Sequence, residues 1–194
     1  SKNLNLTLDL LGENVKDKAT ADATIDAYID LLKGIKEHNI TSSISIKLTM
    51  LGLDIDRQYC LDNLWRLMDV AKEHDQFVRL DMEGTGYTQA TIDIFKEAHA
   101  RYGKHVGIVL QSMLHRTKKD TEELAEMGAD IRMTKGAYKE PAKLALQDMP
   151  AIREAYKEYF KILLDKTPYP RLATHDDELI HWVKQYTEQE GIPK

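Results

Sequence analysis

The sequence contains a single cysteine, Cys60, among its 194 residues. An internal disulfide bond is therefore excluded, and a reducing compartment such as the cytoplasm is expected. Cys60 falls within an apolar helical pattern, which favours a role as buried core filler. The chain also lacks a run of 18 or more apolar residues, so the sequence predicts no transmembrane helix.

Charge of one sign is not concentrated anywhere in the chain. The 27 Lys and Arg residues are interleaved with 32 Asp and Glu residues, and the net charge is −5. Without a basic stripe, nucleic acid is not expected as a partner. Because no basic amphipathic helix is visible, any peripheral membrane association would use parts of a longer protein. The start, Ser1-Lys2-Asn3, is neither a signal peptide nor a natural initiator, which suggests a trimmed chain.

What the chain does contain is a repeating pattern of short apolar strands followed by amphipathic helices. Six such units recur at intervals of roughly 25 to 40 residues, as in parallel α/β proteins. The expected strands are 4–11, 44–49, 77–82, 106–111, the stretch beginning at 131, and 171–175. Thr117-Lys118-Lys119-Asp120 predicts a capping box at the start of the fourth helix.

Side-chain alternation along the second strand favours a barrel over an open sheet. Ser45, Lys47 and Thr49 share one face, while apolar residues occupy the other and need the helices. In an open doubly wound sheet, helices cover both faces and such polar positions would recur less regularly. We therefore predict a (β/α)₈ TIM-barrel-like α/β fold in a single domain, 1–194. Six of the eight units are visible, so the barrel is truncated at its C-terminal side.

Polar residues stand at or near the carboxyl end of each expected strand, where the active sites of such barrels lie. For any one of them, a solvated strand end or an internal ion pair, such as Lys47 with Asp81, is an equally good explanation. The histidines are too sparse to predict a metal site. The set comprises Asp9 with Glu13, Lys47, Asp81, Gln111, Arg132 with Lys135, and Thr174 with His175.

Five segments, together with Leu8–Glu13, resemble successive signature strands of bacterial proline dehydrogenases of the monofunctional, FAD-dependent type. The resemblance implies a TIM-barrel-like fold, bound FAD, and oxidation of L-proline to Δ1-pyrroline-5-carboxylate. It also implies transfer of electrons to a membrane quinone, by a cytoplasmic protein that can associate peripherally with the inner face of the membrane. The five segments are 45–49, 78–83, 107–112, 132–138 and 173–176.

The same resemblance assigns roles to individual residues. It makes Lys47 a partner of the substrate carboxylate, held by a neighbouring Asp81, and places Asp81 and Arg132 at the catalytic centre. The helix that follows His175 would offer its amino terminus to the phosphates of FAD. The residues implied to contact FAD are Met82 and Gln111 at the isoalloxazine, Lys135, Gly136 and Ala137 along the ribityl and phosphate region, and Thr174 and His175 toward the adenosine end.

Two other interpretations remain open at the level of sequence. A barrel aldolase would use Lys47 or Lys135 as a Schiff-base amine. Alternatively, the chain is a catalytically incomplete fragment that only binds a nucleotide. Members of the resembled family continue with two more strands and a final helix bearing an Arg pair that grips the proline carboxylate, and this sequence contains no adjacent Arg-Arg pair.

Overall fold

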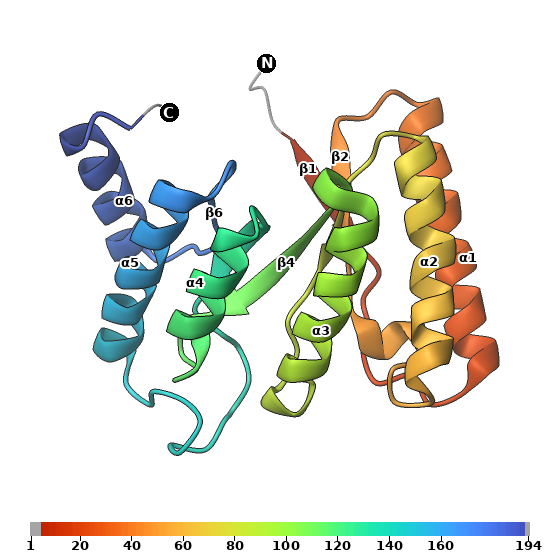
Figure 1. Cartoon of the computed structure of the whole chain (residues 1–194), viewed down its shortest axis with the longest axis horizontal. Coiled ribbons are helices and arrows are strands. Elements are labelled where there is room, and N and C mark those ends of the chain that lie inside the picture. The colour runs from red at the N-terminus through yellow and green to blue at the C-terminus, as the bar shows by residue number, and fades with distance from the viewer. Residues whose placement is uncertain (1–4, 193–194) are drawn as a thin grey trace. The chain divides into compact units, whose positions relative to one another are not determined.

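The computed structural model describes residues 5–192. The chain divides into two compact units, Ser1–Ile108 and Val109–Lys194, and each is described by itself. Figure 1 shows that strands and helices alternate along the chain. Each of the six strands is followed by a helix, as the sequence pattern predicts. Whether the 194 residues form one domain stays a prediction.

The first unit contains four parallel strands in the order β1-β2-β3-β4. The last strand, β4, continues into the second unit. Helices α1, α2 and α3 follow the first three strands, and α1 and α2 lie side by side (Figure 1). The elements are β1 Leu6–Asp9, α1 Lys18–Glu37, β2 Ser42–Ile46, the 3-10 helix η1 Leu48–Leu51, α2 Arg57–Glu73, β3 Val78–Leu80, α3 Thr85–Tyr102, the 3-10 helix η2 Gly103–His105 and β4 Val106–Gln111.

Local sequence explains where α1 begins and which face it buries. The side chain of Asp17 accepts a hydrogen bond from the Thr20 N–H at 2.9 Å, so it caps the first turn. Ile25, Tyr28 and Leu32 recur at helical spacing and are fully buried, which places the apolar face of α1 in the core. The amphipathic helix that the sequence pattern predicts after the first strand is thereby confirmed.

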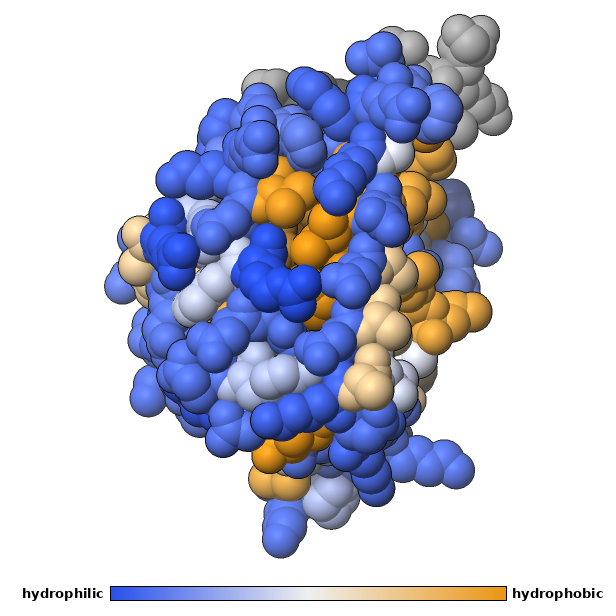
Figure 2. Space-filling model, turned by 90° about the vertical axis from the view of Figure 1, so that its right-hand side faces the viewer, coloured by the Kyte–Doolittle hydropathy of each residue, from blue (hydrophilic) through white to orange (hydrophobic). Residues whose placement is uncertain are grey.

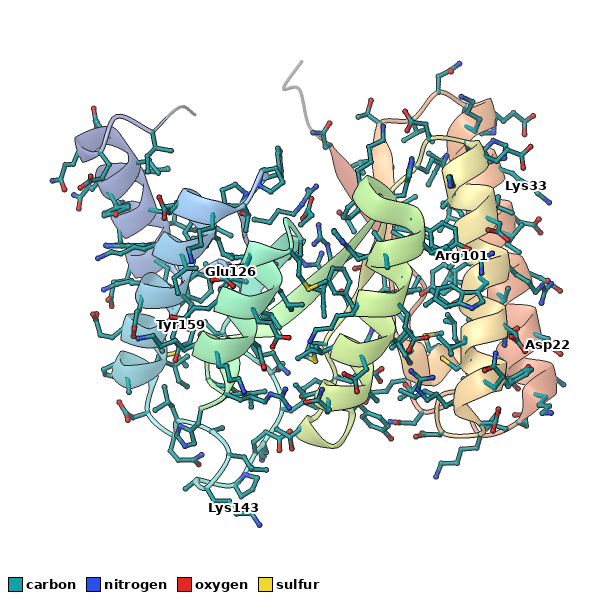
Figure 3. The ribbon with its side chains drawn as sticks, in the orientation of Figure 1. Asp22, Lys33, Arg101, Glu126, Lys143 and Tyr159 are labelled. Carbon is teal, nitrogen blue, oxygen red and sulfur yellow. The ribbon has the colours of Figure 1, made fainter. Side chains whose placement is uncertain are left out.

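Ion pairs and aromatic contacts connect neighbouring helices at the surface. Arg101 of α3 points toward α2 (Figure 3), where its guanidinium lies 3.4 Å from Asp69 and 5.3 Å from the ring centroid of Trp65. Seen from the side of α1 and α2, the surface is mainly hydrophilic, with hydrophobic residues visible between the polar ones (Figure 2).

Cys60 is fully buried, and burial raises the pKa of its thiol to about 12, which confirms its role as core filler.

The second unit contains the end of β4 and the parallel pair β5 and β6, with helices α4, α5 and α6. The carboxyl end of β4 lies beside the end of β5, where the Ser112 N–H donates to the Thr134 carbonyl at 2.8 Å. Asp148 caps α5 by accepting the Ala151 N–H. The elements are α4 Thr117–Glu126, β5 Asp130–Thr134, α5 Met149–Lys166, β6 Arg171–Leu172 and α6 Asp177–Gln189.

Several sequence predictions of local structure are wrong, and the third strand, expected over 77–82, spans only Val78–Leu80. The second strand ends at Ile46 rather than Thr49, because the chain turns into η1 directly after Lys47. The predicted capping box does not form, since the Thr117 hydroxyl donates to the Gln111 carbonyl at 2.6 Å instead of capping α4. The last strand is two residues long instead of five. The first predicted strand began at Leu4, which lies outside the described residues.

In the part of the chain that the structure describes, no helix is both long enough and apolar enough to cross a membrane.

Candidate active site

In the first unit, the strand register brings polar side chains together on one face. Asp9 of β1 is in register with Ser45 of β2, and Ser45 is in register with Arg79 of β3. Side chains alternate along a strand, so residues two positions apart share a face. Lys47 and Asp81 lie two residues beyond Ser45 and Arg79 and therefore continue the same face. The Asp81 N–H still donates to the Ile46 carbonyl at 2.8 Å, so the pairing extends beyond the end of β3.

Lys47 is paired with Asp9. Its ammonium nitrogen lies 3.4 Å from Asp9 Oδ2, and 19% of its side chain is exposed. The Tyr28 hydroxyl donates to the other Asp9 oxygen at 3.0 Å. Burial, and then the Asp9 charge, raise the pKa of Tyr28, so its hydroxyl keeps the proton that it donates. Lys47 therefore has a fixed carboxylate partner, and that partner is Asp9 rather than the expected Asp81.

Asp81 is held by a different residue. The Ser45 hydroxyl donates to Asp81 Oδ1 at 2.7 Å, and Ser45 is itself buried. Met82, which follows Asp81, is 6% exposed. The segment after β3 thus carries two of the predicted site residues, Asp81 held by a hydrogen bond and Met82 buried.

A buried cation lies in the same unit. Arg79 is 2% exposed, donates to the Ile108 carbonyl at 3.2 Å, and stacks over the ring of Phe77 at 4.6 Å. Sequence reasoning missed it, although a charged residue in the middle of an apolar strand signals a buried polar contact.

In the second unit, the end of β4 carries Gln111, which is predicted to contact the flavin, and β5 carries Arg132, which is predicted to lie at the catalytic centre. Gln111 is the last residue of β4 and is buried. Arg132 lies in β5, in register with Arg171 of β6, and is half-buried. Thr134 follows two residues later, and its hydroxyl donates to the Leu110 carbonyl at 3.1 Å. These contacts fix the backbone that presents Gln111 and Arg132.

Gly136 occupies a position that a side chain would disrupt. Its φ is +110°, a conformation that L-residues rarely adopt. A Cβ atom built there would lie 2.5 Å from the sulfur of Met113. The backbone therefore passes close to Met113, and a side chain at this position would clash with it.

Lys135 belongs to a network of charges centred on Asp176. The ammonium of Lys135 lies 2.8 Å from Asp176 Oδ2, and Arg153 Nε lies 2.9 Å from the same oxygen. Only 5% of the Asp176 side chain is exposed. Hydrogen bonds from Lys135 and then Arg153 hold the pKa of Asp176 well below its usual range. Sequence reasoning did not assign Asp176 or Arg153 to the site, because their partners lie more than 20 residues away.

The amino terminus of α6 is already occupied by carboxylates. The other oxygen of Asp176 accepts the Glu178 N–H at 3.2 Å, and Asp177 and Glu178 lie in the first turn. A phosphate would be repelled by these charges, which weakens the expectation that this helix end receives one. Thr174 and His175, the two predicted contacts with FAD, precede Asp176. The Thr174 hydroxyl oxygen accepts the Asp176 N–H at 3.1 Å, and His175 is exposed. Ala137 is also exposed.

Tyr156 of α5 is a structural residue that sequence reasoning did not assign to the site. Its hydroxyl donates to the Met133 carbonyl at 2.7 Å and accepts the Ala173 N–H at 3.1 Å. The side chain is fully buried, and its two hydrogen bonds connect β5 to the segment after β6.

Within residues 5–192, no group of three or more His, Cys, Asp or Glu side chains is arranged to hold a metal ion.

The sequence profile of the proline dehydrogenase family matches residues 1–194. The chain is 36% identical over 192 residues to proline dehydrogenase 2 of Bacillus subtilis strain 168, and covers 63% of that protein. It is 35% identical over 191 residues to proline dehydrogenase of Deinococcus radiodurans, and covers 62% of it. These alignments take in 99% and 96% of the chain. The chain thus spans less than two thirds of the length of these relatives.

Among solved structures, proline utilization A (PutA) from Bdellovibrio bacteriovorus inactivated by N-propargylglycine superimposes with a TM-score of 0.86 at 22% sequence identity. The match covers 98% of this chain and 24% of that one. At this identity the likeness concerns the fold, and it confirms the predicted TIM-barrel-like α/β class. Because its profile matches over the whole length, the chain belongs to the proline dehydrogenase family.

Proposed function

We propose that the protein to which this chain belongs oxidises L-proline to Δ1-pyrroline-5-carboxylate, with FAD as the hydride acceptor. The observation that carries the proposal is the family match over residues 1–194, supported by relatives that are named proline dehydrogenases. Transfer of the electrons to a quinone, peripheral contact with a membrane and a cytoplasmic location belong to the same proposal. They are consequences of the family and rest on no residue described above.

The residues of the second unit fit the chemistry of a flavin nucleotide. FAD, when bound, would supply an acceptor for the two electrons and the hydride of proline oxidation. Gly136 offers a backbone without a side chain, and Lys135, which pairs with Asp176 but keeps 23% of its side chain exposed, offers a cation that phosphate oxygens would share with that carboxylate. Gln111 has both a donor and an acceptor for the pyrimidine edge. The charge of Arg132 would stabilise negative charge that develops on the ring.

The first unit supplies groups suited to the substrate. We assign the Lys47 ammonium to the proline carboxylate, since its bond to Asp9 is long at 3.4 Å and its side chain is partly exposed. A carboxylate that binds at a shorter distance would compete with Asp9 for the same charge. Asp81, fixed by Ser45, would set the position of the substrate amine rather than abstract a proton. If proline binds with a neutral amine, no strong base is needed.

The test is an absorbance titration of the purified chain with FAD, followed by anaerobic addition of L-proline. Bleaching of bound flavin by L-proline, and not by D-proline, is the expected result. Flavin that binds without bleaching would support the nucleotide-binding fragment instead. If neither this chain nor a version extended to the length of its relatives bound flavin, the proposal would be wrong.

The aldolase alternative is disfavoured by the surroundings of both candidate lysines. A Schiff-base lysine must be uncharged, and apolar surroundings favour that form. Lys47 is paired with Asp9, and Lys135 is paired with the buried Asp176. Each lysine therefore lies beside a carboxylate rather than in the apolar surroundings that this mechanism needs. Borohydride trapping with a carbonyl substrate would give no covalent adduct if this reasoning is right.

A further inference from the structure

Glu83 is a buried carboxyl group for which the proposed function has no role. It lies in the turn between β3 and α3, two residues after Asp81, and is 1% exposed. A carboxylate is costly to bury unless hydrogen bonds compensate for the lost water. Burial raises the pKa of Glu83, while hydrogen bonds from Thr49 lower it. The contacts of this group therefore need an explanation.

Both carboxylate oxygens of Glu83 contact Thr49, a fully buried residue of η1. Oε1 accepts the Thr49 N–H at 3.2 Å, and Oε2 accepts the Thr49 hydroxyl at 2.5 Å. Lys47 caps η1, and its carbonyl accepts the Met50 N–H at 3.1 Å. Glu83 thus fixes the short helix on which the backbone position of Lys47 depends.

Thr49 extends this fixation to the loop after β1. Its hydroxyl oxygen accepts the Asn14 N–H at 2.8 Å, and its carbonyl accepts the Val15 N–H at 3.2 Å. Because that hydroxyl accepts from Asn14, its own hydrogen is directed to Glu83. Asn14 has a φ of +58°, which is uncommon for a residue other than glycine and persists only when its surroundings hold it.

We propose that Glu83 is a positioning residue for substrate binding, acting through Thr49 on the backbone of Lys47 and on the loop at Asn14. The inference rests on the proposed function. The turn that carries Asp81 also carries Glu83, so a single buried group connects the segments that follow β1, β2 and β3. Charged hydrogen bonds of this kind are stronger than neutral ones, which suits a contact that must fix geometry.

Two variants remove the connection in different ways. Glu83→Gln keeps the shape but places an amide opposite the Thr49 hydroxyl, and Thr49→Val keeps the shape but removes the hydroxyl. Thr49→Ser restores the hydroxyl. Glu97→Gln is the matched control, because Glu97 lies on α3 with 45% of its side chain exposed.

The first readout needs neither flavin nor substrate. Amide hydrogen exchange of Asn14 and Val15 should accelerate at least about tenfold in Glu83→Gln and Thr49→Val, as expected when a buried charged hydrogen bond is lost. Thr49→Ser and Glu97→Gln should exchange like the wild type. Unchanged exchange in Thr49→Val would overturn the inference even if Glu83→Gln failed to fold.

The second readout separates binding from chemistry. In the FAD-loaded protein, the L-proline concentration for half-maximal bleaching should rise roughly tenfold in Thr49→Val, with a smaller change in the maximal rate. Faster exchange with unchanged proline affinity would reduce Glu83 to a structural residue and leave the proposed function intact. If wild-type flavin were not bleached by proline, the proposed function itself would fail, and this inference about substrate would fail with it.

Discussion

Gly136→Ala is the substitution whose effect the structure determines best. The new Cβ would lie 2.5, 2.7 and 2.8 Å from the sulfur, Cγ and Cε atoms of Met113. Met113 cannot move freely, since it is 5% exposed and packs in a cluster with Leu114, Ala145 and Ile152. Its N–H also donates to the Lys135 carbonyl at 3.0 Å, which holds the two segments together.

Two costs add in this variant. A residue other than glycine at a φ of +110° costs about 1–3 kcal/mol, and overpacking of a buried cluster costs about 1–3 kcal/mol more. The free energy of unfolding should therefore fall by roughly 2–6 kcal/mol, and the midpoint temperature by roughly 4–24 °C for a chain of this size. Flavin affinity should fall as well, because Lys135 and Ala137 flank the altered backbone.

Gly34→Ala is the matched control for the same chemical change. Gly34 lies inside α1. Apart from the backbone of the helix itself, no atom of the described residues lies within 4 Å of a Cβ built at this position. Alanine favours a helix interior over glycine by about 0.5–1 kcal/mol, so this variant should be slightly more stable than the wild type. Urea unfolding followed by circular dichroism measures both variants.

A third variant separates the two costs. Adding Met113→Ala to Gly136→Ala removes the clash and leaves the backbone strain, so the double variant should lose less stability than the sum of the single ones. Strict additivity would show that the clash contributes nothing. A loss below about 1 kcal/mol in Gly136→Ala alone would contradict both parts of the reasoning.

Two further predictions concern the charged groups. The pKa of Asp176 is lowered in the folded chain by Lys135 and Arg153, so its contribution to stability is present above its ordinary pKa of 3.8 and is lost as the pH falls below that value. In urea unfolding, Asp176→Asn should be less stable than the wild type at pH 6, and this difference should shrink between pH 4 and 2.5; a constant difference would mean that the charge is not responsible. Ser45→Ala removes the 2.7 Å hydrogen bond to Asp81 and should cost about 1 kcal/mol of stability. It should also slow flavin bleaching by proline more than it changes flavin affinity, and an unaltered rate would argue against a catalytic position for Asp81.

The sequence by itself determined the order of the elements and the membership of the proline dehydrogenase family. Helical spacing of Ile25, Tyr28 and Leu32 predicts the buried face of α1, and the structure buries all three fully. Short apolar runs predict six strands, and all six are present. These features are local, because they depend on side-chain periodicity within a few turns or residues. The motifs around Lys47 and Arg132 are also read directly from the chain, and the family match agrees with them.

Only the tertiary structure decided which of these polar groups contact one another. Lys47 pairs with Asp9 because the register of β1 and β2 brings segments 38 residues apart side by side, and no local pattern specifies that register. Thr49 lies in η1 rather than in the predicted strand. There its N–H and hydroxyl donate to Glu83, and its hydroxyl oxygen accepts the Asn14 N–H. A polar group that is buried loses its hydrogen bonds to water and needs a partner within the protein. Which partner is within reach depends on the folded core, so the local sequence does not specify it.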